Sequence, residues 1–436
     1  MLHTHHATRR PLRPEILILL TLLAPATAFA QTAQTTATPP KSVLTKEQAI
    51  DLALTHNQSM RASRLTVAQS QAGEVTAALK PNPVFTSTNS DFPVFAPGQL
   101  TFSNASTNQT FTQALTYLFE RGGKRDRRIQ VARDTTEMTA RTVDDTERQL
   151  RFQVGQAFVN VLLAKANLEA ARADLRDFGQ TVDLSRRRVA GGDLAEGDYL
   201  KIALQKLQFE QDESAAEIAL VQGKAALRQL VGYDAVREDF DVAGTLEHRK
   251  ATVTLDALQQ QALAARPDLQ AAGASTKLAA STVALARSNR AVDITGEVEY
   301  DRNGPVNGVG FGLSLPIPIH DRNQGEIARS QVALSQASES EAAARVAVLT
   351  DVANAYAAFE SNEKVVSLYE SGYLAQAQQS RDISRYAFTK GATGLLDLLD
   401  AERTYRATQL AYRQALAAHL TSIEQLNFAV GKQVIP

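Results

Sequence analysis

Apolar residues recur every seven positions along two long stretches of the chain. The first stretch carries them at Val154, Val161, Leu168, Leu175, Val182 and Val189. A seven-residue repeat is the period of a coiled coil. No proline lies between Pro97 and Pro267, so the pattern predicts one helix over about residues 124–190, which would be ~100 Å long at about 1.5 Å per residue. The second stretch has the same spacing at Val352, Phe359, Val366 and Tyr373, and it predicts a matching helix over about 324–389.

A period of two residues marks strands in two other places. Residues 292–300 alternate, with apolar side chains at Val292, Ile294, Val298 and Tyr300. A turn is predicted over 301–308 and a second strand over 309–319, so that one hairpin covers about 292–319. Its counterpart covers about 84–119, with a longer loop over 91–107. Each hairpin approaches the ~10 residues per strand that a tilted membrane strand needs, which predicts an apolar face toward lipid.

The chain repeats itself. Residues 44–60 align with 253–269, and residues 190–200 align with 389–399. The alignment predicts two repeats, about 44–232 and 253–431, joined by a segment of about 232–253. Each repeat contains a helix-to-helix turn with glycine, at about 190–198 and 389–395, where glycine suits a helix end that needs a positive φ. Those turns are either functional tips or simple connectors.

The N-terminus reads as a signal peptide over residues 1–30. Arg9, Arg10 and Arg13 precede an apolar run, and Ala28 and Ala30 fit the cleavage site. The absence of cysteine excludes disulfides and an acylated cysteine. The whole chain has a net charge of −1 and the removed segment carries +2, so residues 31–436 carry −3. This near-neutral balance, with no basic stripe standing apart from balancing acids, argues against a nucleic-acid partner.

Two hairpins supply four strands, which cannot close a barrel. An open sheet edge is not tolerated in lipid, so a membrane role requires several chains to share one barrel. Three chains would give twelve strands. The alternative is a soluble periplasmic coiled-coil scaffold with a β-layer covering its helices.

Three motifs lie where the predicted strands meet the helices: LKPNPVF at 79–85, FERGGKRDRRI at 119–129 and LPIPIHDRNQGEIA at 315–328. Together they resemble the TolC family of outer-membrane efflux proteins, in its heavy-metal (CzcC-like) branch. The resemblance spans residues 31–436. The junction residues that carry it are Pro81, Pro83, Gly122, Gly123, Pro316, Pro318, Asp321, Arg322 and Asn323.

The resemblance implies a mainly α fold with a membrane β part, built from a duplicated helix–β-hairpin–long helix–helix protomer. It implies a homotrimer with a 12-stranded barrel in the outer membrane of a Gram-negative bacterium, continued by a periplasmic α-helical barrel. Such a duct works passively with a periplasmic membrane-fusion adaptor and an inner-membrane RND-type transporter. The branch implies heavy-metal cargo, such as cobalt, zinc, cadmium, copper or silver. Multidrug or organic-substrate efflux and protein secretion stay as alternatives.

The resemblance also assigns roles to the two turns. The adaptor-docking tips correspond to Gly191, Gly192, Leu194, Gly197, Gly391, Thr393 and Gly394. The channel entrance corresponds to Asp397 and Asp400, to which Asp193, Glu196 and Asp198 add negative charge. Carboxylates at i and i+3 lie on nearly one helix face, and rings of them favour cations. The family's gate latch uses a Tyr and an Arg, where this chain has Phe388 and Thr393, so that latch is not expected. The alternative is that Asp397 and Asp400 are ordinary solvated residues.

No catalytic constellation is present in the sequence. There is no nucleophile elbow, phosphate loop or helix with paired metal-binding histidines, and beyond residue 30 the histidines are widely separated: His56, His248, His320 and His419. The sequence therefore predicts a protein that is not an enzyme, with no cofactor and no resident metal.

Overall fold

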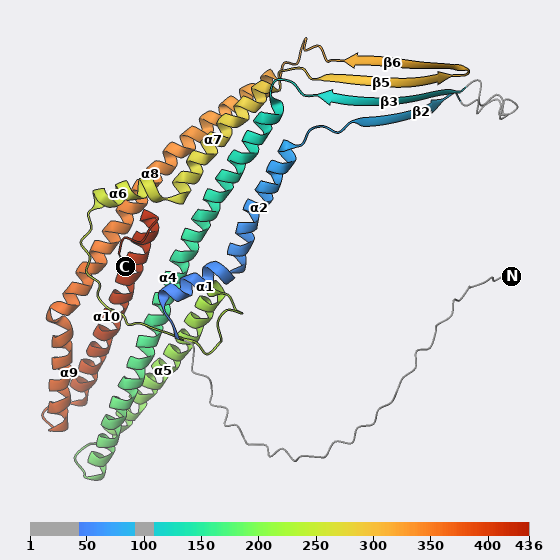
Figure 1. Ribbon diagram of the computed structural model, residues 1–436. Helices are drawn as coiled ribbons and strands as arrows, with labels where there is room; N and C mark the ends of the chain where they lie inside the picture. The colour runs from blue at the N-terminus through green and yellow to red at the C-terminus, as the bar shows by residue number, and fades with distance from the viewer. Residues whose placement is uncertain (1–42, 92–108, 436) are drawn as a thin grey trace, which may run out of the picture. The chain divides into compact units, whose positions relative to one another are not determined.

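A computed structural model describes residues 43–91 and 109–435 (Figure 1). The predicted signal peptide and most of the loop 91–107 lie outside the described residues. The first half of the chain folds into α1 (Lys46–His56), α2 (Gln58–Ala78), β2 (Val84–Ser90), β3 (Thr110–Phe119), α4 (Lys124–Ala190) and α5 (Glu196–Val231). The second half folds into α6 (Leu255–Ala265), α7 (Pro267–Ser288), β5 (Ile294–Asn303), β6 (Val306–Ser314), α8 (Gln324–Leu368), α9 (Leu374–Thr389) and α10 (Leu395–Val430).

The bounds of the helices correspond between the two halves. Adding 209 to the bounds of α1 gives those of α6, and adding 199 to those of α5 gives those of α10. The break between α1 and α2 falls at Asn57, and the break between α6 and α7 falls at Arg266, which is 209 residues later. Equivalent sequence positions therefore bend the chain in the same way.

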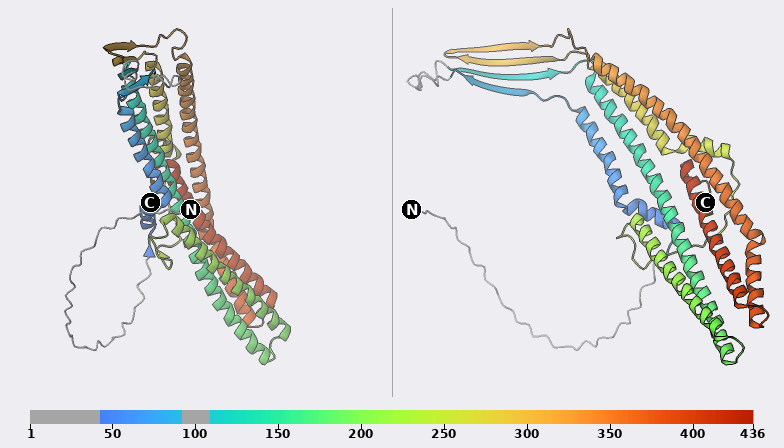
Figure 2. Two further views of the ribbon diagram at one scale, coloured as in Figure 1. Left: turned by 90° about the vertical axis from the view of Figure 1, so that its right-hand side faces the viewer. Right: turned by 180° about the vertical axis from the view of Figure 1, so that it is seen from behind.

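The long helix predicted over 124–190 is confirmed, because α4 runs over 67 residues without interruption. The seven-residue stripe faces its neighbours, with Val154, Val161, Leu168 and Val182 all buried. Helices α2, α5, α7 and α10 pack along α4 (Figures 1 and 2). Across the described residues, no helix combines the length and apolarity needed to cross a membrane.

The prediction of one continuous second helix over 324–389 was wrong. A π-helix, η2 (Tyr369–Tyr373), separates α8 from α9, and inside it Gly372 has a φ of 139°, which residues with a Cβ rarely adopt. The wider turn changes the phase of the seven-residue stripe. Val366 is fully buried, whereas Tyr373, seven positions later, is 60% exposed.

Four antiparallel strands form one sheet in the order β2-β3-β5-β6. Residues 301–303, predicted as part of a turn, belong to β5 and pair with residues 306–308 of β6. Only Gly304 and Pro305 make the turn, because Gly304 takes the positive φ of 58° that a two-residue hairpin turn requires. The second strand, predicted to reach residue 319, ends at Ser314, just before Pro316 and Pro318, which have no N–H to donate.

The segment that joins the two halves is held across the middle of the helices. Its short strand β4 (Asp241–Val242) pairs in parallel with β1 (Val43–Leu44). Lys165 of α4 binds Asp241 at 2.8 Å, and His248 binds Glu370 of η2 at 2.8 Å. The four-stranded sheet extends from one end of the long helices, and the α4–α5 and α9–α10 turns lie at the other end (Figures 1 and 2).

Candidate functional site

The two helix turns farthest from the sheet form the first candidate site. The α4–α5 turn needs Gly192, with a φ of 81°, and the α9–α10 turn needs Gly391, with a φ of 74°. Gly191 has an ordinary φ of −83°, and Gly394 is the N-cap of α10. Gly197 is the second residue of α5. Two of the five predicted tip glycines therefore carry the positive φ that ends a helix.

Arg188 joins the two tips. Its Nη1 donates to the carbonyl oxygen of Phe388 at 2.9 Å, and its Nη2 donates to that of Asp193 at 3.3 Å. The guanidinium also lies 5.3 Å from the centre of the Phe388 ring. Beyond three consecutive arginines near the end of α4, nothing in the sequence indicates this contact, because it joins residues 200 positions apart.

An apolar cluster lies beneath the tips and fixes their position. Phe178 stacks on Phe209 with ring centres 4.3 Å apart, and Phe388 and Leu398 are buried beside them. Leu194, a predicted tip residue, packs against this cluster. The Oγ1 of Thr393 is buried and has no hydrogen-bond partner among the described residues.

The predicted entrance residues lie at these two tips. Asp397 and Asp400 are both exposed on α10, on either side of the buried Leu398. Asp193 and Glu196 are also exposed, while Asp198 pairs with Lys201 at 3.1 Å. In the part of the chain that the structure describes, no group of three or more His, Asp or Glu residues is arranged to hold a metal ion.

Charged pairs above the tips tie three helices together, and they were missed at the level of sequence. Arg406 of α10 lies between Asp212 of α5 and Asp174 of α4, at 3.5 Å from the latter, and over the Phe209 ring at 4.1 Å. Burial raises the pKa of Asp174, against the opposing effect of Arg406. Opposite charges on separate helices cannot be matched without the fold, so no sequence signal was available.

The strand–helix junctions form the second candidate site. Gly122 and Gly123 have φ of 71° and 67°, and a side chain on Gly122 would overlap the Cβ of Ala291. Asn323 occupies the same left-handed N-cap position before α8 that Gly123 occupies before α4.

Side chains lock the second junction. Asn323 donates through Nδ2 to the carbonyl oxygen of Ala286 at 2.7 Å, and its backbone N–H donates to Asp321 at 2.8 Å. Arg322 donates to the carbonyl oxygen of Pro318 at 3.3 Å. The predicted residues Pro81, Pro83 and Pro316 lie in the connections between helices and strands.

The four-stranded sheet has one apolar and one polar face. Its register places Phe85, Leu115, Val298 and Phe311 in one row across all four strands. All four side chains are about half exposed or more, and Phe311 is 84% exposed. The opposite face carries Glu297, Glu299 and Asp301 on β5, each paired with a glycine of β6. A sheet that exposes large apolar side chains on one whole face is a surface that another phase or molecule covers.

Comparison with known proteins identifies the type of molecule. The sequence matches the family described as "Outer membrane efflux protein" over residues 49–233 and 258–432, which is more than half of the chain. It is 24% identical to the cobalt-zinc-cadmium resistance protein CzcC of Cupriavidus metallidurans, over 89% of this chain and 90% of that protein. It is 27% identical to the nickel-cobalt-cadmium resistance protein NccC of Alcaligenes xylosoxydans xylosoxydans, over 76% and 73%.

Solved structures share the fold. The crystal structure of CusC superposes with a TM-score of 0.75 at 20% identity, covering 89% of this chain and 92% of that one. That of the outer membrane protein VceC from Vibrio cholerae superposes with a TM-score of 0.70 at 19% identity, covering 89% and 97%. The chain therefore belongs to the outer membrane efflux protein family, whose members are outer-membrane channels of Gram-negative bacteria with long periplasmic helices, and it is not an enzyme.

Proposed function

We propose that this chain is one of three identical protomers of an exit duct, the outer-membrane part of a tripartite efflux system that exports heavy-metal cations. The observation that carries the proposal is the four-stranded sheet, with its continuous apolar face and its junction to a 67-residue helix. Within the described residues, β2 and β6 each have one unpaired edge. Unpaired backbone groups are costly in lipid, so a closed sheet shared between chains satisfies both edges.

Three copies would supply twelve strands to such a barrel. The row from Phe85 to Phe311 would then meet lipid, and the polar face would line the lumen. The helices would continue the duct through the periplasm, which supports the predicted placement of the α4–α5 and α9–α10 turns at the far end.

The charge of the polar face supports a cationic cargo. Glu297, Glu299 and Asp301 are paired with Gly312, Gly310 and Gly308, so β6 places no side chain directly opposite any of the three. Among the described residues of β2, β3, β5 and β6, the only Lys or Arg is Arg302, and the strand alternation places it on the apolar face. An acidic wall favours cations over anions in a narrow pore.

The two tips support the proposed periplasmic entrance of the duct. Asp397 and Asp400, exposed on the first turns of α10, would form two rings of carboxylates at the entrance, with Asp193, Glu196 and Asp198 adding charge nearby. The two tips would bind the periplasmic adaptor, which connects the duct to an inner-membrane RND-type transporter. The residues at this contact would be Gly191, Gly192, Leu194, Gly197, Gly391, Thr393 and Gly394. The names of the relatives CzcC and NccC support cobalt, zinc, nickel or cadmium as cargo.

Deletion of the gene tests the cargo. We expect the deletion strain to lose tolerance to cobalt, zinc or cadmium and to regain it when the unmodified gene is returned. If tolerance to antibiotics falls and tolerance to all metals is unchanged, the metal assignment is wrong although the duct is retained.

Planar-bilayer recordings test the entrance. Replacing Asp397 and Asp400 by alanine should raise single-channel conductance, because the shorter side chains widen the entrance, and should weaken cation preference. The matched control replaces two exposed acids away from the tips, Glu238 and Glu339, by alanine. Equal conductance and selectivity in the two double variants would remove Asp397 and Asp400 from the gate.

A further inference from the structure

Positive charge gathers where the helices meet the sheet. Residues 79–82, 120–133, 287–293 and 320–329 together carry eleven Lys or Arg and five Asp or Glu, a net charge of +6. The whole chain has a net charge of −1, so the other residues sum to −7. A concentration of one sign against an acidic background marks a surface that attracts the opposite charge.

These four segments converge in space. Arg125 donates to the carbonyl oxygen of Ala78 at 2.7 Å, which ties the start of α4 to the end of α2. The backbone N–H of Arg121 donates to Asp293 at 2.9 Å, and Asn323 donates to Ala286 at 2.7 Å. The first, second, third and fourth segments are therefore fixed to one another at a single level of the molecule.

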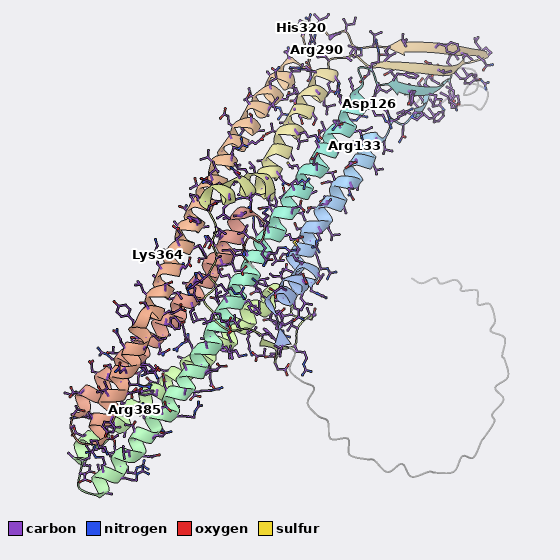
Figure 3. The ribbon with its side chains drawn as sticks, turned by 60° about the vertical axis from the view of Figure 1, so that its left-hand side comes forward. Asp126, Arg133, Arg290, His320, Lys364 and Arg385 are labelled. Carbon is purple, nitrogen blue, oxygen red and sulfur yellow. The ribbon has the colours of Figure 1, made fainter. Side chains whose placement is uncertain are left out.

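Many of the cations at this level have no carboxylate partner. Lys124 pairs with Asp293 at 2.7 Å, and Arg128 pairs with Glu120. Seven other cations are exposed, and none of them forms an ion pair within residues 43–91 and 109–435. We name these seven the junction collar: Lys80, Arg121, Arg127, Arg133, Arg287, Arg290 and Arg322. Figure 3 shows Arg290 at the end of the helices from which the strands leave.

The collar directly borders the apolar face of the sheet. Arg121 comes two residues after Phe119, which is 53% exposed, and Arg322 comes three residues after Ile319, which is 66% exposed. Leu315 and Ile317 extend the apolar surface beyond the end of β6. An apolar band followed at once by long basic side chains is the arrangement that spans the boundary between lipid tails and phosphate headgroups.

We propose that the junction collar binds the phosphate headgroups of anionic phospholipids in the membrane leaflet nearest the helices. The inference rests on the proposed membrane placement of the sheet. The guanidinium and ammonium groups of the collar would bind the phosphate, and the apolar band lies next to them. The apolar band selects a lipid over a free phosphate ion, because the acyl chains continue onto the exposed face of the sheet.

The test uses the full-length protein in phosphatidylcholine bilayers that contain about one-fifth phosphatidylglycerol. Native mass spectrometry of the protein released from these bilayers counts the lipids that it retains. The unmodified protein should retain phosphatidylglycerol in clear excess over its share of the bilayer. The triple variant Arg121→Gln, Arg127→Gln, Arg290→Gln should lower that excess by about fivefold to tenfold.

The matched control replaces three exposed, unpaired cations far from the sheet, as Arg61→Gln, Arg187→Gln, Lys364→Gln. Lys364 lies near the C-terminal end of α8, away from the strands (Figure 3). This control should retain phosphatidylglycerol as the unmodified protein does. An equal loss in both triple variants would overturn the proposal, because net charge alone would then explain the retention.

Two further arms keep the test independent of folding defects in the variants. For the unmodified protein, raising the salt to about 0.5 M should abolish the phosphatidylglycerol excess, since exposed charges are then screened. Inorganic phosphate at matched concentration should not displace the lipid, and displacement would indicate a free-phosphate site instead. A protein that enters pure phosphatidylcholine bilayers but shows no phosphatidylglycerol excess refutes the collar alone, whereas one that enters no bilayer refutes the proposed function.

Discussion

The two halves of the chain bend at equivalent positions with different chemistry. In the first half, Asn57 lies between α1 and α2, and its Nδ2 donates to the carbonyl oxygen of Leu230 at the end of α5 at 2.9 Å. In the second half, Arg266 lies between α6 and α7, and its Nη1 donates to the carbonyl oxygen of Ala429 at the end of α10 at 3.2 Å. We call these the first hub (Asn57, Leu230, Gly232) and the second hub (Arg266, Ala429, Gly431).

The first hub is neutral. The Oδ1 of Asn57 accepts the N–H of Met60 at 3.0 Å and so caps α2 while the other end of the amide holds α5. The second hub performs the same bridging with a buried positive charge. Arg266 is 4% exposed, and it binds Asp268 through Nε at 2.9 Å and Asp351 through Nη1 at 3.0 Å.

A second arginine extends the charged network of the second hub. Arg148 of α4 lies 3.5 Å from Asp268, donates to the carbonyl oxygen of Phe428 at 2.7 Å and lies 4.0 Å above the Phe428 ring. Both hubs therefore need a hydrogen-bond donor to the last turn of the helix that returns to them, α5 or α10. An amide meets that requirement alone, whereas a guanidinium also requires carboxylates, and those carboxylates tie α4, α7 and α8 to α10.

The largest effect that would separate the hubs comes from removing the buried guanidinium. Arg266→Leu removes the partner of Asp351, leaves Asp268 with Arg148 alone, and leaves the carbonyl of Ala429 without its donor. The side chains of Asp268 and Asp351 are 34% and 51% exposed, so water can solvate the carboxylates that remain. The lost hydrogen bonds and the unpaired carbonyl should together cost about 2–4 kcal/mol. We expect a matching fall in the free energy of unfolding, measured by urea denaturation of the detergent-solubilised protein.

The corresponding change in the first hub provides the comparison. Asn57→Ala removes a neutral cap and one hydrogen bond, which costs about 1–2 kcal/mol. If Asn57→Ala destabilises the protein as much as Arg266→Leu does, the charge of the second hub adds nothing to the role of the shared donor.

The glycine of each hub should show an effect that is common to both hubs. Gly232 and Gly431 have φ of 109° and 85°, and an added Cβ would lie 3.1 Å from the Cβ of His56 and from the Cα of Arg266, respectively. Alanine at either position should cost about 1–3 kcal/mol because the backbone is left-handed and the space is filled. Differential scanning calorimetry of the two variants measures both losses.

Gly73 is the control for these substitutions. It lies inside α2, and an added Cβ there would meet nothing within 4 Å. Alanine at Gly73 should raise stability by about 0.5–1 kcal/mol, since glycine weakens a helix interior. A loss of stability at Gly73 comparable with that at Gly232 would show that the backbone argument is wrong.

Features that repeat along the chain can be predicted from the sequence. The seven-residue stripe predicted α4 with its observed bounds, and the residues before and after the hairpins were placed at the junctions where the structure has them. Beyond Val366 the stripe no longer predicts which residues are buried, because one π turn around Gly372 shifts the phase of the helix. A single glycine does not predict such a turn.

Contacts between distant segments were beyond the reach of one sequence. Arg188 meets Phe388 across 200 residues. The charged network of the second hub joins Arg148 of α4 and Asp351 of α8 to Arg266, which lies between α6 and α7. Nothing in local periodicity indicates which of many charged residues will be buried together. The internal repeat did align Asn57 with Arg266, but an aligned Asn and Arg do not reveal that both donate to a helix end.

The smallest expected difference between the two hubs is in how their stability depends on pH. Burial alone would raise the pKa of Asp268, but hydrogen bonds from Arg266 and the charges of Arg266 and Arg148 outweigh burial and hold this pKa below its usual value of 3.8. A group with a lowered folded pKa contributes stability that is present above its unfolded value and is lost as pH falls through the folded pKa. The second hub should therefore loosen below about pH 4, whereas the first hub, built on an amide, should not.

Hydrogen exchange, corrected for the intrinsic effect of pH, should show α7 losing protection on acidification while α2 keeps it. Asp268→Asn should remove the difference and Asp256→Asn, at an exposed site on α6, should leave it in place; equal acid loosening of α2 and α7 would mean that the charge network does not distinguish the hubs.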